Sequence, residues 1–485
     1  MWKVQRGYPM YEWPTRDFFA LALYNYLFYD LYARILAVIA VPSMQLPIAA
    51  KLLTVPFAAI GAVVQYATAL GILKRRGIAA SRAVLAAFAF CTWFGPGFIG
   101  AWAVSARPDV AASAFAAAAF AVCVSVVDSG NRARLILAGV LFYLAWAFKQ
   151  SAVQMLTGVC LYFLIVRRSI RLLTLAIVPF GILVALTIVF GGAAYRYNVL
   201  VAPSVAQGFE WWTSWFFLRG VFLPNLPVWA TLAFAVWRAF AAHRDGGDWP
   251  LGRDVTLLCA CTVVTTFGGA FVFMAKTGSA LNHAFEFWVV SALCASLVFG
   301  TLAWSPHQSS RRVHAIAAAL FTLPLLFTVA HLGGSERVIR ILGLSASVER
   351  MRLGSEAEYA ARAALVDRLR ALPRPVHIDD ELLAQPWYAN ADRYPAIVLD
   401  RVFYDAAGGR GLLENGGVLS LVERRYFGTV VAYVPPFNVF RTARSAGYVE
   451  VARLPWLRDD EAVVLVRSDP PLSDQIKRPT RRRTP

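Results

Sequence analysis

The amino-acid sequence predicts an all-α membrane bundle of about ten transmembrane helices, followed by a small extracytoplasmic α/β domain. Three observations lead to this expectation. Hydrophobic residues make up 58% of the 485 residues and charged residues only 16%, whereas soluble domains have roughly 45–50% apolar and about 25% charged residues. Several apolar runs are long enough to cross about 30 Å of hydrocarbon. After Gly333 the sequence becomes charged, and short strand-like runs replace the long apolar ones.

Most of the expected spans are uninterrupted apolar runs. The first is Ile48–Leu73, where Lys51 lies near one end and can extend its ammonium group to the interface. The others of this kind are Val110–Val127, Leu172–Ala193, Leu226–Ala242, Val255–Ala275, Phe287–Trp304 and Val313–Leu332.

Three expected spans are interrupted or short. Ala83–Gly100 contains Gly95-Pro96-Gly97, so we expect its helix to break near the end of the run. Leu135–Phe148 and Ala152–Val166 are separated by Lys149-Gln150-Ser151. This pattern predicts a hairpin of two short spans, with the lysine at its tip.

Basic residues in the short loops predict the orientation. Alternate loops hold about fourteen Lys and Arg residues on one side and about five on the other. Because the richer side is normally cytoplasmic, we expect residues 1–47 and everything after Leu332 to be extracytoplasmic. Nothing in residues 1–30 looks able to carry the N-terminus across a membrane, so we also expect one further apolar span upstream of Met1.

The chain therefore divides into four expected parts. Residues 1–47 form the first extracytoplasmic loop with interfacial helices, and residues 48–332 form the transmembrane domain. Residues 333–475 form the α/β domain, and the basic residues 476–485 form a disordered tail. Within the α/β domain, strands are expected at Pro375–Ile378, Ala396–Leu399 and Ala462–Val466, with helical sequence at Ser345–Leu372.

Charge and cysteine usage limit the partners. The net charge of +18 comes with Lys and Arg beside the apolar spans, so we expect anionic lipid headgroups rather than nucleic acid as the partner. The six cysteines lie in or beside apolar runs without paired loop spacing. This placement argues against a disulfide framework and against a zinc site.

The distinctive polar residues all fall on the expected outer face. They are the candidate catalytic carboxylates Glu12, Asp17 and Asp109 and the candidate substrate-binding residues Arg107, Lys149, Gln150, Arg219, Lys276, Asn282, His283 and Glu286. Lys149 is costly between two short apolar runs unless it reaches headgroups or a ligand anion. The segment from Lys276 to Glu286 places a cation, an amide, an imidazole and a carboxylate in one loop.

Structural explanations compete with functional ones at several of these positions. An aromatic belt explains the tyrosines between Tyr8 and Tyr29, although it explains Glu12 and Asp17 poorly. Helix-start preferences explain Pro108 and Asp109 about as well as a function does. The tryptophans near Arg219 suit an interfacial belt or stacking on a sugar face.

Together these segments resemble bacterial glycosyltransferases of the GT-C superfamily, which use lipid-linked sugars and include lipopolysaccharide-modifying and protein-mannosylating enzymes. The resemblance covers most of the chain, from about Gly7 to the end of the spans. It rests on the pattern G-x-P-x-Y-x-x-P from Gly7 to Pro14, the Arg-Pro-Asp before a span, the Lys-Gln-Ser tip, and K-x-G-S-x-x-N-x-x-x-E from Lys276 to Glu286. The family's acidic residue in the first outer loop matches Glu12, but glutamate replaces aspartate and Trp13 is inserted, so Asp17 stays an alternative.

The resemblance implies a hexosyl- or pentosyltransferase of the bacterial inner membrane. Its donor is a sugar on polyprenyl phosphate, and its acceptor is a hydroxyl of a glycan, lipid or protein. A carboxylate takes the hydroxyl proton, cations neutralise the departing phosphate, and single displacement inverts the anomeric centre. The family allows a divalent metal, but no ligand cluster in the sequence demands one. Asp109 is expected to orient the acceptor or to hold Arg107.

Two other functions stay open from the sequence. A transporter or flippase of lipid-linked sugars would need polar residues at the middle of the membrane and broken helices in corresponding halves of the chain. A non-catalytic assembly protein would use the outer domain to bind a partner. An enzyme instead requires the outer-face carboxylates and lysines to surround one cavity.

Overall fold

The computed structural model describes residues 1–13, 22–41, 45–95, 99–222, 251–276, 281–302, 371–378, 408–433, 438–455 and 461–468, apart from a few single positions within them. Several expected features lie outside these residues. They are the spans Leu226–Ala242 and Val313–Leu332, the strand Ala396–Leu399, almost all of the helical segment Ser345–Leu372, the carboxylate Asp17 and the tail 476–485.

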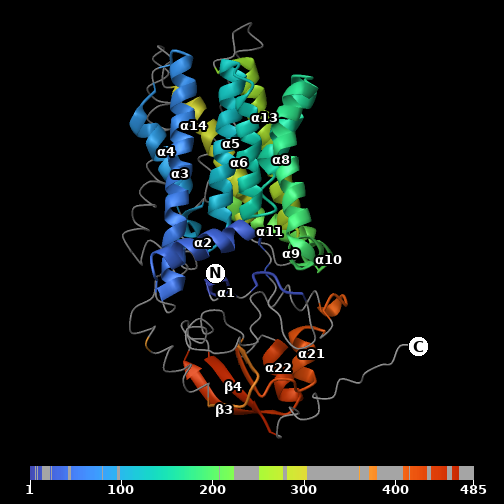
Figure 1. The fold of residues 1–485 in the computed structure, drawn as a ribbon. Coiled ribbons are helices and arrows are strands. Elements are labelled where there is room, and N and C mark those ends of the chain that lie inside the picture. Colours follow the sequence, from blue (N-terminus) through green and yellow to red (C-terminus); the bar gives the residue numbers. More distant parts are fainter. Residues whose placement is uncertain are drawn as a thin grey trace, which may run out of the picture.

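The apolar helices of the described residues run side by side as one bundle (Figure 1). Four of them are long and apolar enough to cross a membrane: α3 (Leu46–Arg75), α5 (Asp109–Ser129), α8 (Ile170–Phe190) and α13 (Arg253–Met274). The shorter apolar helices are α4 (Arg82–Phe94), α6 (Arg134–Phe148), α7 (Gln154–Leu161), which continues in a π-helical turn at Tyr162–Val166, and α14 (Phe285–Leu302). The helical membrane bundle is confirmed, and the total of about ten spans stays a prediction.

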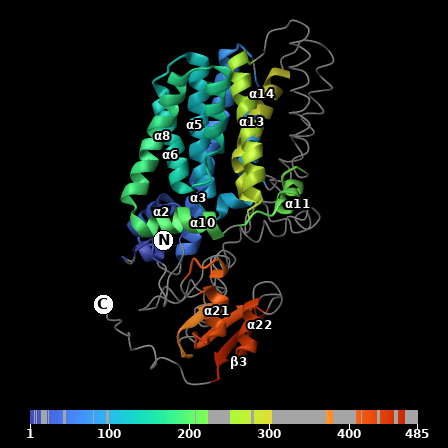
Figure 2. The ribbon, with the colours of Figure 1, turned by 90° about the vertical axis from the view of Figure 1, so that its right-hand side faces the viewer.

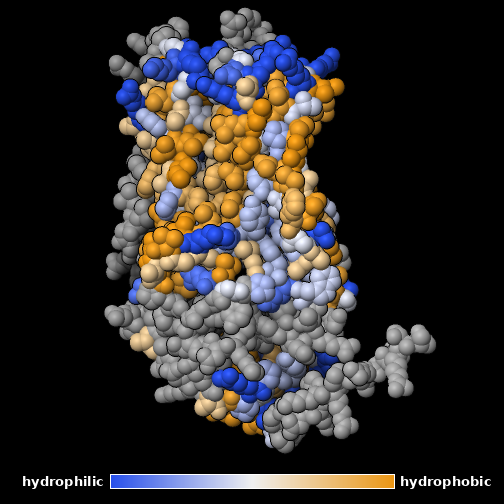
Figure 3. Space-filling view, in the orientation of Figure 1, coloured by the Kyte–Doolittle hydropathy of each residue, from blue (hydrophilic) through white to orange (hydrophobic). Residues whose placement is uncertain are grey.

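The helices of the bundle differ in what surrounds them. In α5, 67% of the most apolar window is buried by protein, whereas in α8 the share is 11%. The large side chains of α8 are therefore exposed, including Ile182 and Val189. Figure 3 shows the apolar band that such side chains form on the face of the bundle turned to the viewer. Lipid must cover this band, because apolar surface of this extent is unfavourable in water.

Hydrophilic side chains gather at the end of the bundle remote from the C-terminal sheet (Figure 3). Two ion-pair groups join helices there. Asp128 at the end of α5 accepts from Arg75 Nε and, at 2.5 Å, from Arg76 Nη2. Asp254 at the start of α13 accepts from Arg167 Nη1 at 2.5 Å and from the Tyr162 hydroxyl at 3.1 Å. These contacts fix the spacing of helices that are distant in the sequence.

Short helices cover the opposite end of the bundle. The helix α2 (Tyr26–Val38) crosses beneath the bundle in Figure 1, so the aromatic stretch at Tyr24–Tyr29 begins a helix that lies across the spans. The Asn25 side chain caps α2 by accepting from the Tyr26 N–H at 3.3 Å. The other elements near this end are α1 (Trp2–Gln5), the 3₁₀ helices Gly100–Val104 and Leu281–Ala284, α9 (Gly192–Arg196), the π-helical turn η4 (Tyr197–Val201), α10 (Ala202–Ala206) and α11 (Trp211–Phe222).

The C-terminal residues form a small four-stranded sheet with the order β1-β2-β4-β3. Its strands are β1 (Val376–Ile378), β2 (Thr429–Tyr433), β3 (Tyr448–Pro455) and β4 (Glu461–Arg467), accompanied by the helices α21 (Gly417–Glu423) and α22 (Asn438–Ser445). β1 pairs parallel to β2, and the other pairs are antiparallel. The expected strands at Pro375–Ile378 and Ala462–Val466 are present, and β2 and β3 were not predicted from the sequence.

The sheet lies beyond the end of the bundle that carries α2 and α10, as both ribbon views show (Figures 1 and 2). Tyr197 and Ala202, from the segment after α8, belong to the hydrophobic core of this C-terminal domain. The Tyr197 hydroxyl also donates to the Leu412 carbonyl. The bundle and the C-terminal domain are therefore joined through η4 and α10.

Packing inside the bundle predicts which glycines tolerate a side chain. A Cβ atom at Gly61 of α3 would lie 2.3 Å from the Trp93 ring, and Trp93 is fully buried and donates to Gln65 Oε1 at 3.0 Å. The ring cannot move aside, so we expect Gly61→Ala to cost about 1–3 kcal/mol of stability. Thermal unfolding in detergent measures this loss.

The control is Gly181→Ala on α8, where an added methyl group would have nothing within 4 Å. This change should leave the melting temperature unchanged or slightly raised, because alanine is the better helix former. Equal melting temperatures for the two variants would contradict the packing of α3 against α4.

Candidate functional site

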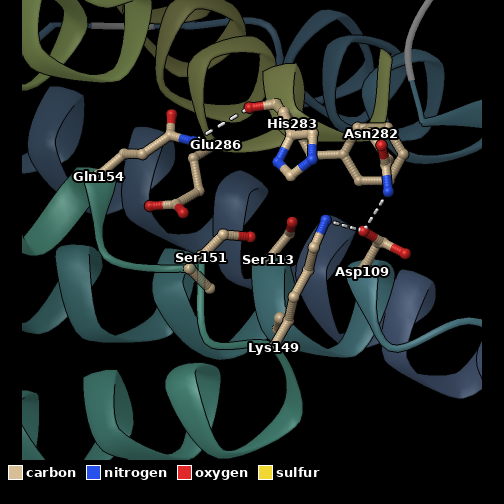
Figure 4. Close-up of a pocket in the computed structure, with 11 residues that line it drawn as sticks. Asp109, Ser113, Lys149, Ser151, Gln154, Asn282, His283 and Glu286 are labelled. Carbon is tan, nitrogen blue, oxygen red and sulfur yellow. Dashed lines mark hydrogen bonds and ion pairs between the residues drawn. The ribbon is translucent and has the colours of Figure 1, made fainter. Parts of the chain in front are cut away.

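A polar pocket forms where three separate segments of the chain meet (Figure 4). The segments are the first turns of α5, the tip between α6 and α7, and the 3₁₀ turn that leads into α14. The pocket is lined by Asp109, Ala112, Ser113, Lys149, Ser151, Ala152, Gln154, Asn282, His283, Phe285 and Glu286. Five of the predicted site residues are thus brought together: Asp109, Lys149, Asn282, His283 and Glu286.

Asp109 is the centre of the pocket's polar contacts. It is the first residue of α5 and only 2% exposed. Its Oδ1 accepts from Lys149 Nζ and, at 2.7 Å, from Asn282 Nδ2. Its Oδ2 is buried without a hydrogen-bond partner among the described residues. Because the α5 N-terminus favours a carboxylate and Lys149 neutralises it, the buried charge is compensated.

Lys149 directly follows the last residue of α6, where the backbone becomes extended. The predicted break between the two short apolar runs is therefore present, and α7 starts five residues later. The lysine is 7% exposed and its ammonium points toward Asp109 (Figure 4). A lysine has three N–H donors, so two remain after the bond to Asp109 and could bind a ligand anion.

Glu286 and Gln154 connect α14 with α7. Glu286 Oε2 accepts from the Met155 backbone N–H at 2.7 Å, and Gln154 Nε2 donates to the His283 carbonyl at 3.1 Å. Val153, the N-cap residue of α7, offers no side-chain cap, so the carboxylate of Glu286 caps this helix from another part of the chain. The sequence suggested substrate binding for Glu286, and the structure gives it a contact that holds the hairpin tip.

Lys276 and His283 both lie against the ring of Phe273. The His283 ring stacks on Phe273 with centroids 5.7 Å apart, and Lys276 Nζ lies 5.4 Å from the centre of the Phe273 ring. Burial lowers the pKa of Lys276. A backbone bridge with Phe209 and the bond from the Glu210 N–H to the Ala275 carbonyl, 2.7 Å long, hold this segment in place. Lys276 therefore lies beside the pocket, next to one of its lining residues.

The remaining predicted residues lie elsewhere. Arg107 is exposed, with its guanidinium 5.0 Å from the centre of the Trp102 ring. Gln150 is partly buried beside Lys149 at the tip. Arg219 belongs to α11, and its side chain lies outside the described part of the chain. Glu12 is partly buried in the N-terminal segment and is not one of the residues that line the pocket.

The N-terminal segment is held against the end of the bundle by polar contacts that sequence reasoning missed. Asn198 Nδ2 donates to the Glu12 carbonyl at 2.7 Å. The Tyr195 hydroxyl donates to Asn25 Oδ1 at 2.6 Å, and Asn25 Nδ2 donates to the Trp146 carbonyl at 2.7 Å. Partners more than 100 residues apart leave no local pattern, so only the fold reveals these contacts.

The tyrosines of the N-terminal segment have structural partners. Tyr11 packs edge-on against Tyr195 with centroids 5.1 Å apart, and burial raises the pKa of Tyr11. Tyr26 and Tyr143 share a hydrogen bond of 2.7 Å between their hydroxyls. Packing against the bundle thus accounts for Tyr11 and Tyr26.

Metal ligands do not cluster in the described residues, where no group of three or more His, Cys, Asp or Glu side chains could hold a metal ion. The described residues give the pocket a compensated buried carboxylate, the ammonium group of Lys149, an amide and a neighbouring second ammonium. Such a set suits an anionic ligand that also carries polar groups.

Solved structures share this fold. ArnT from Cupriavidus metallidurans bound to undecaprenyl phosphate has a TM-score of 0.52 and 13% sequence identity, with 96% of each chain covered. Apo ArnT from the same organism has a TM-score of 0.51 and 14% identity, with 91% of this chain and 87% of that chain covered. No family model and no curated protein matches the chain. The chain therefore shares the fold of these two solved structures, which is the fold that the resemblance implies.

The cap on α7 predicts a specific loss of order. Replacing the carboxylate in Glu286→Ala leaves the Met155 N–H buried without an acceptor, which costs about 1–3 kcal/mol. Hydrogen exchange at Met155 should become faster, together with exchange in the rest of the first turn of α7.

Glu286→Gln is the matched control, because its amide oxygen can still accept from Met155. It should keep most of the protection. Unchanged exchange in Glu286→Ala would show that the carboxylate does not cap this helix.

Proposed function

Because the chain has a GT-C fold, we propose that it is an integral membrane glycosyltransferase that moves a sugar from a polyprenyl-phosphate donor to a hydroxyl acceptor. The reaction takes place at the outer face of the bacterial inner membrane and inverts the anomeric centre. The donor class has support from the structural neighbour ArnT, which has been solved with undecaprenyl phosphate bound.

One observation carries the proposal. Asp109, Lys149 and Asn282 come from three segments and meet in one buried contact at the ends of apolar helices. A buried lysine in an apolar bundle is expensive and is normally retained for a ligand or a transported ion. A lipid phosphate is the anion that such a site meets in a membrane, and Lys276 adds a second cation beside the pocket.

In the proposed reaction, Lys149 and Lys276 bind the phosphate of the donor lipid. Asp109, which also accepts from Asn282, orients the Lys149 ammonium and leaves two of its N–H groups for phosphate oxygens. As the bond between the anomeric carbon and the phosphate oxygen breaks, negative charge grows on the leaving phosphate. The two ammonium groups stabilise that charge in an environment of low dielectric.

The acceptor hydroxyl attacks the anomeric carbon and loses its proton to a carboxylate. We assign this general base to Glu12, with Asp17 as the alternative in the same loop. Asp109 is the third candidate, but its Oδ1 already accepts from Lys149 and Asn282. Because these two contacts already occupy that oxygen, we assign Asp109 an orienting role.

A flippase or transporter fits the described geometry less well. Asp109 begins α5 and Lys149 follows the end of α6, so the polar contact lies at helix ends rather than at mid-membrane, where transporters bind their substrates. The direct test of the enzyme is transfer of radiolabelled sugar from synthetic polyprenyl-phosphate donors to a membrane acceptor extract by the purified protein. Donor translocation across vesicles without transfer would favour the flippase instead.

The phosphate assignment predicts a loss of donor affinity. Lys149→Met and Lys276→Met each remove a cation, so each should weaken donor-lipid binding by roughly 10-fold or more, because charge-assisted hydrogen bonds contribute about 1.5–3 kcal/mol. Binding of a labelled polyprenyl-phosphate sugar in detergent measures the change.

Arg196→Met is the control, since Arg196 is an exposed cation of α9 that does not line the pocket. It should bind the donor with parental affinity. Parental affinity in both lysine variants would remove them from the phosphate site.

The base assignment predicts a loss of rate without a loss of binding. Glu12→Gln keeps the size and hydrogen bonding of the side chain but cannot accept the proton. The variant should therefore insert into the membrane and bind donor lipid normally. Its transfer rate should fall by about 100- to 10,000-fold. Single-turnover transfer at saturating donor measures this rate.

Glu210→Gln, at an exposed glutamate, should transfer sugar at the parental rate. If the transfer rate falls in Asp17→Asn and stays parental in Glu12→Gln, the base is Asp17. If the transfer rate stays parental in both variants, Asp109 becomes the next residue to test.

A further inference from the structure

Asn198 is a buried amide that holds two distant points of the N-terminal segment. It lies in the π-helical turn η4 and has no solvent exposure. Its Nδ2 donates to the Glu12 carbonyl at 2.7 Å and to the Ala194 carbonyl at 2.9 Å. Its Oδ1 accepts from the Ala22 N–H at 3.1 Å.

The amide orientation is fixed by its partners. Carbonyl oxygens only accept and the Ala22 N–H only donates, so the nitrogen and oxygen of Asn198 cannot be exchanged. Both amide N–H groups are used, which compensates the cost of burying them. An apolar side chain could fill the same space, but it could not hold the backbone at Glu12 and Ala22 together.

The neighbours of Asn198 hold the same segment from both sides. Tyr195 contacts the Tyr11 ring and donates to Asn25. The Tyr197 ring lies 5.2 Å from the Trp13 ring, measured between centroids. One short stretch of chain therefore contacts the N-terminal segment directly before Glu12, at Glu12, directly after it and again at Ala22 and Asn25.

We propose that Asn198 is a positioning residue, which holds the backbone at Glu12 against that at Ala22 and so sets where the carboxylate of Glu12 stands relative to the bound donor. The proposal deepens the glycosyltransferase function and rests on it. Asn198 acts through the backbone of the segment that carries Glu12, because its side chain is fully buried and bonded to the backbones of Glu12 and Ala22.

A base that is displaced by about 1 Å can lose about 100-fold in rate, because proton transfer requires close and aligned contact. Asn198→Ala removes all three hydrogen bonds. We expect the kcat of transfer to fall by about 10- to 100-fold while the KM for donor lipid stays unchanged, since Lys149 and Lys276 are untouched. Hydrogen exchange at the Ala22 amide should become at least about tenfold faster.

Asn198→Asp distinguishes the hydrogen bond with Ala22 from the hydrogen bond with Glu12. The aspartate can still accept from the Ala22 N–H, but it cannot donate to the Glu12 carbonyl when ionised. The Ala22 amide should stay protected while kcat falls by about tenfold. This variant keeps the test usable if Asn198→Ala does not fold.

Gln65→Ala is the control for general destabilisation. Gln65 is also a buried amide, bonded to Thr92 and Trp93 at 3.2 and 3.0 Å within the bundle. It should lose comparable thermal stability and keep its kcat and the Ala22 protection. If kcat falls equally in Gln65→Ala, lost stability alone explains the result for Asn198→Ala, and the proposal is overturned.

The remaining outcomes are also decisive. Parental kcat in Asn198→Ala, with transfer intact in the unmodified protein, would overturn this proposal alone. Unchanged Ala22 exchange in Asn198→Ala would show that the contact does not hold the segment, and would overturn it too. Absence of transfer by the unmodified protein from every donor would remove the proposed function, and this proposal with it.

Discussion

The buried pair of Asp109 and Lys149 is the contact on which the arrangement of the site depends. Neither charge could be buried alone among apolar helices, because an isolated ion there costs several kcal/mol. Together, and with the Asn282 amide on the same carboxylate oxygen, they compensate one another. The segments that carry Asp109, Lys149 and Asn282 can therefore be buried together only when these three side chains are in contact. The pair therefore specifies the packing of the hairpin tip against α5 and α14, and it leaves donors facing the pocket.

The sequence predicted the bundle, and it singled out five residues that line the candidate pocket, for clear physical reasons. Long apolar runs are dictated by the thickness of the membrane, and Lys149 between two short runs signals a break. Asp109, Asn282 and His283 fell in loops on one expected face, so their meeting could be anticipated. The small C-terminal domain followed from the change in composition after Gly333.

Other features had no local signal. The contacts of Asn198 with Glu12 and of Glu286 with Met155 join residues 186 and 131 positions apart, and a single sequence does not encode such pairings locally. The strand β3 contains Glu450 and Arg453, which form an ion pair 2.6 Å long. Because of these charged residues, the hydropathy pattern of the sequence did not indicate a strand there. Hydropathy also cannot tell α5, packed within protein, from α8, which faces the apolar surroundings, because both are strongly apolar.

The π-helical turn η4 has a consequence for how this protein can change in evolution. A π-helical turn contains one more residue than the α-helical turn it replaces, and each residue turns the chain by about 100°. In η4, consecutive residues serve different parts of the molecule, because Tyr197 bonds the C-terminal domain and Asn198 bonds the N-terminal segment. Deleting one residue of this turn would restore the α-helical phase and rotate the residues that follow the deletion relative to Tyr197 and Asn198 or to the preceding helix. Length, rather than residue identity alone, is therefore under constraint here, and homologous chains with the same junction should align through this turn without a gap.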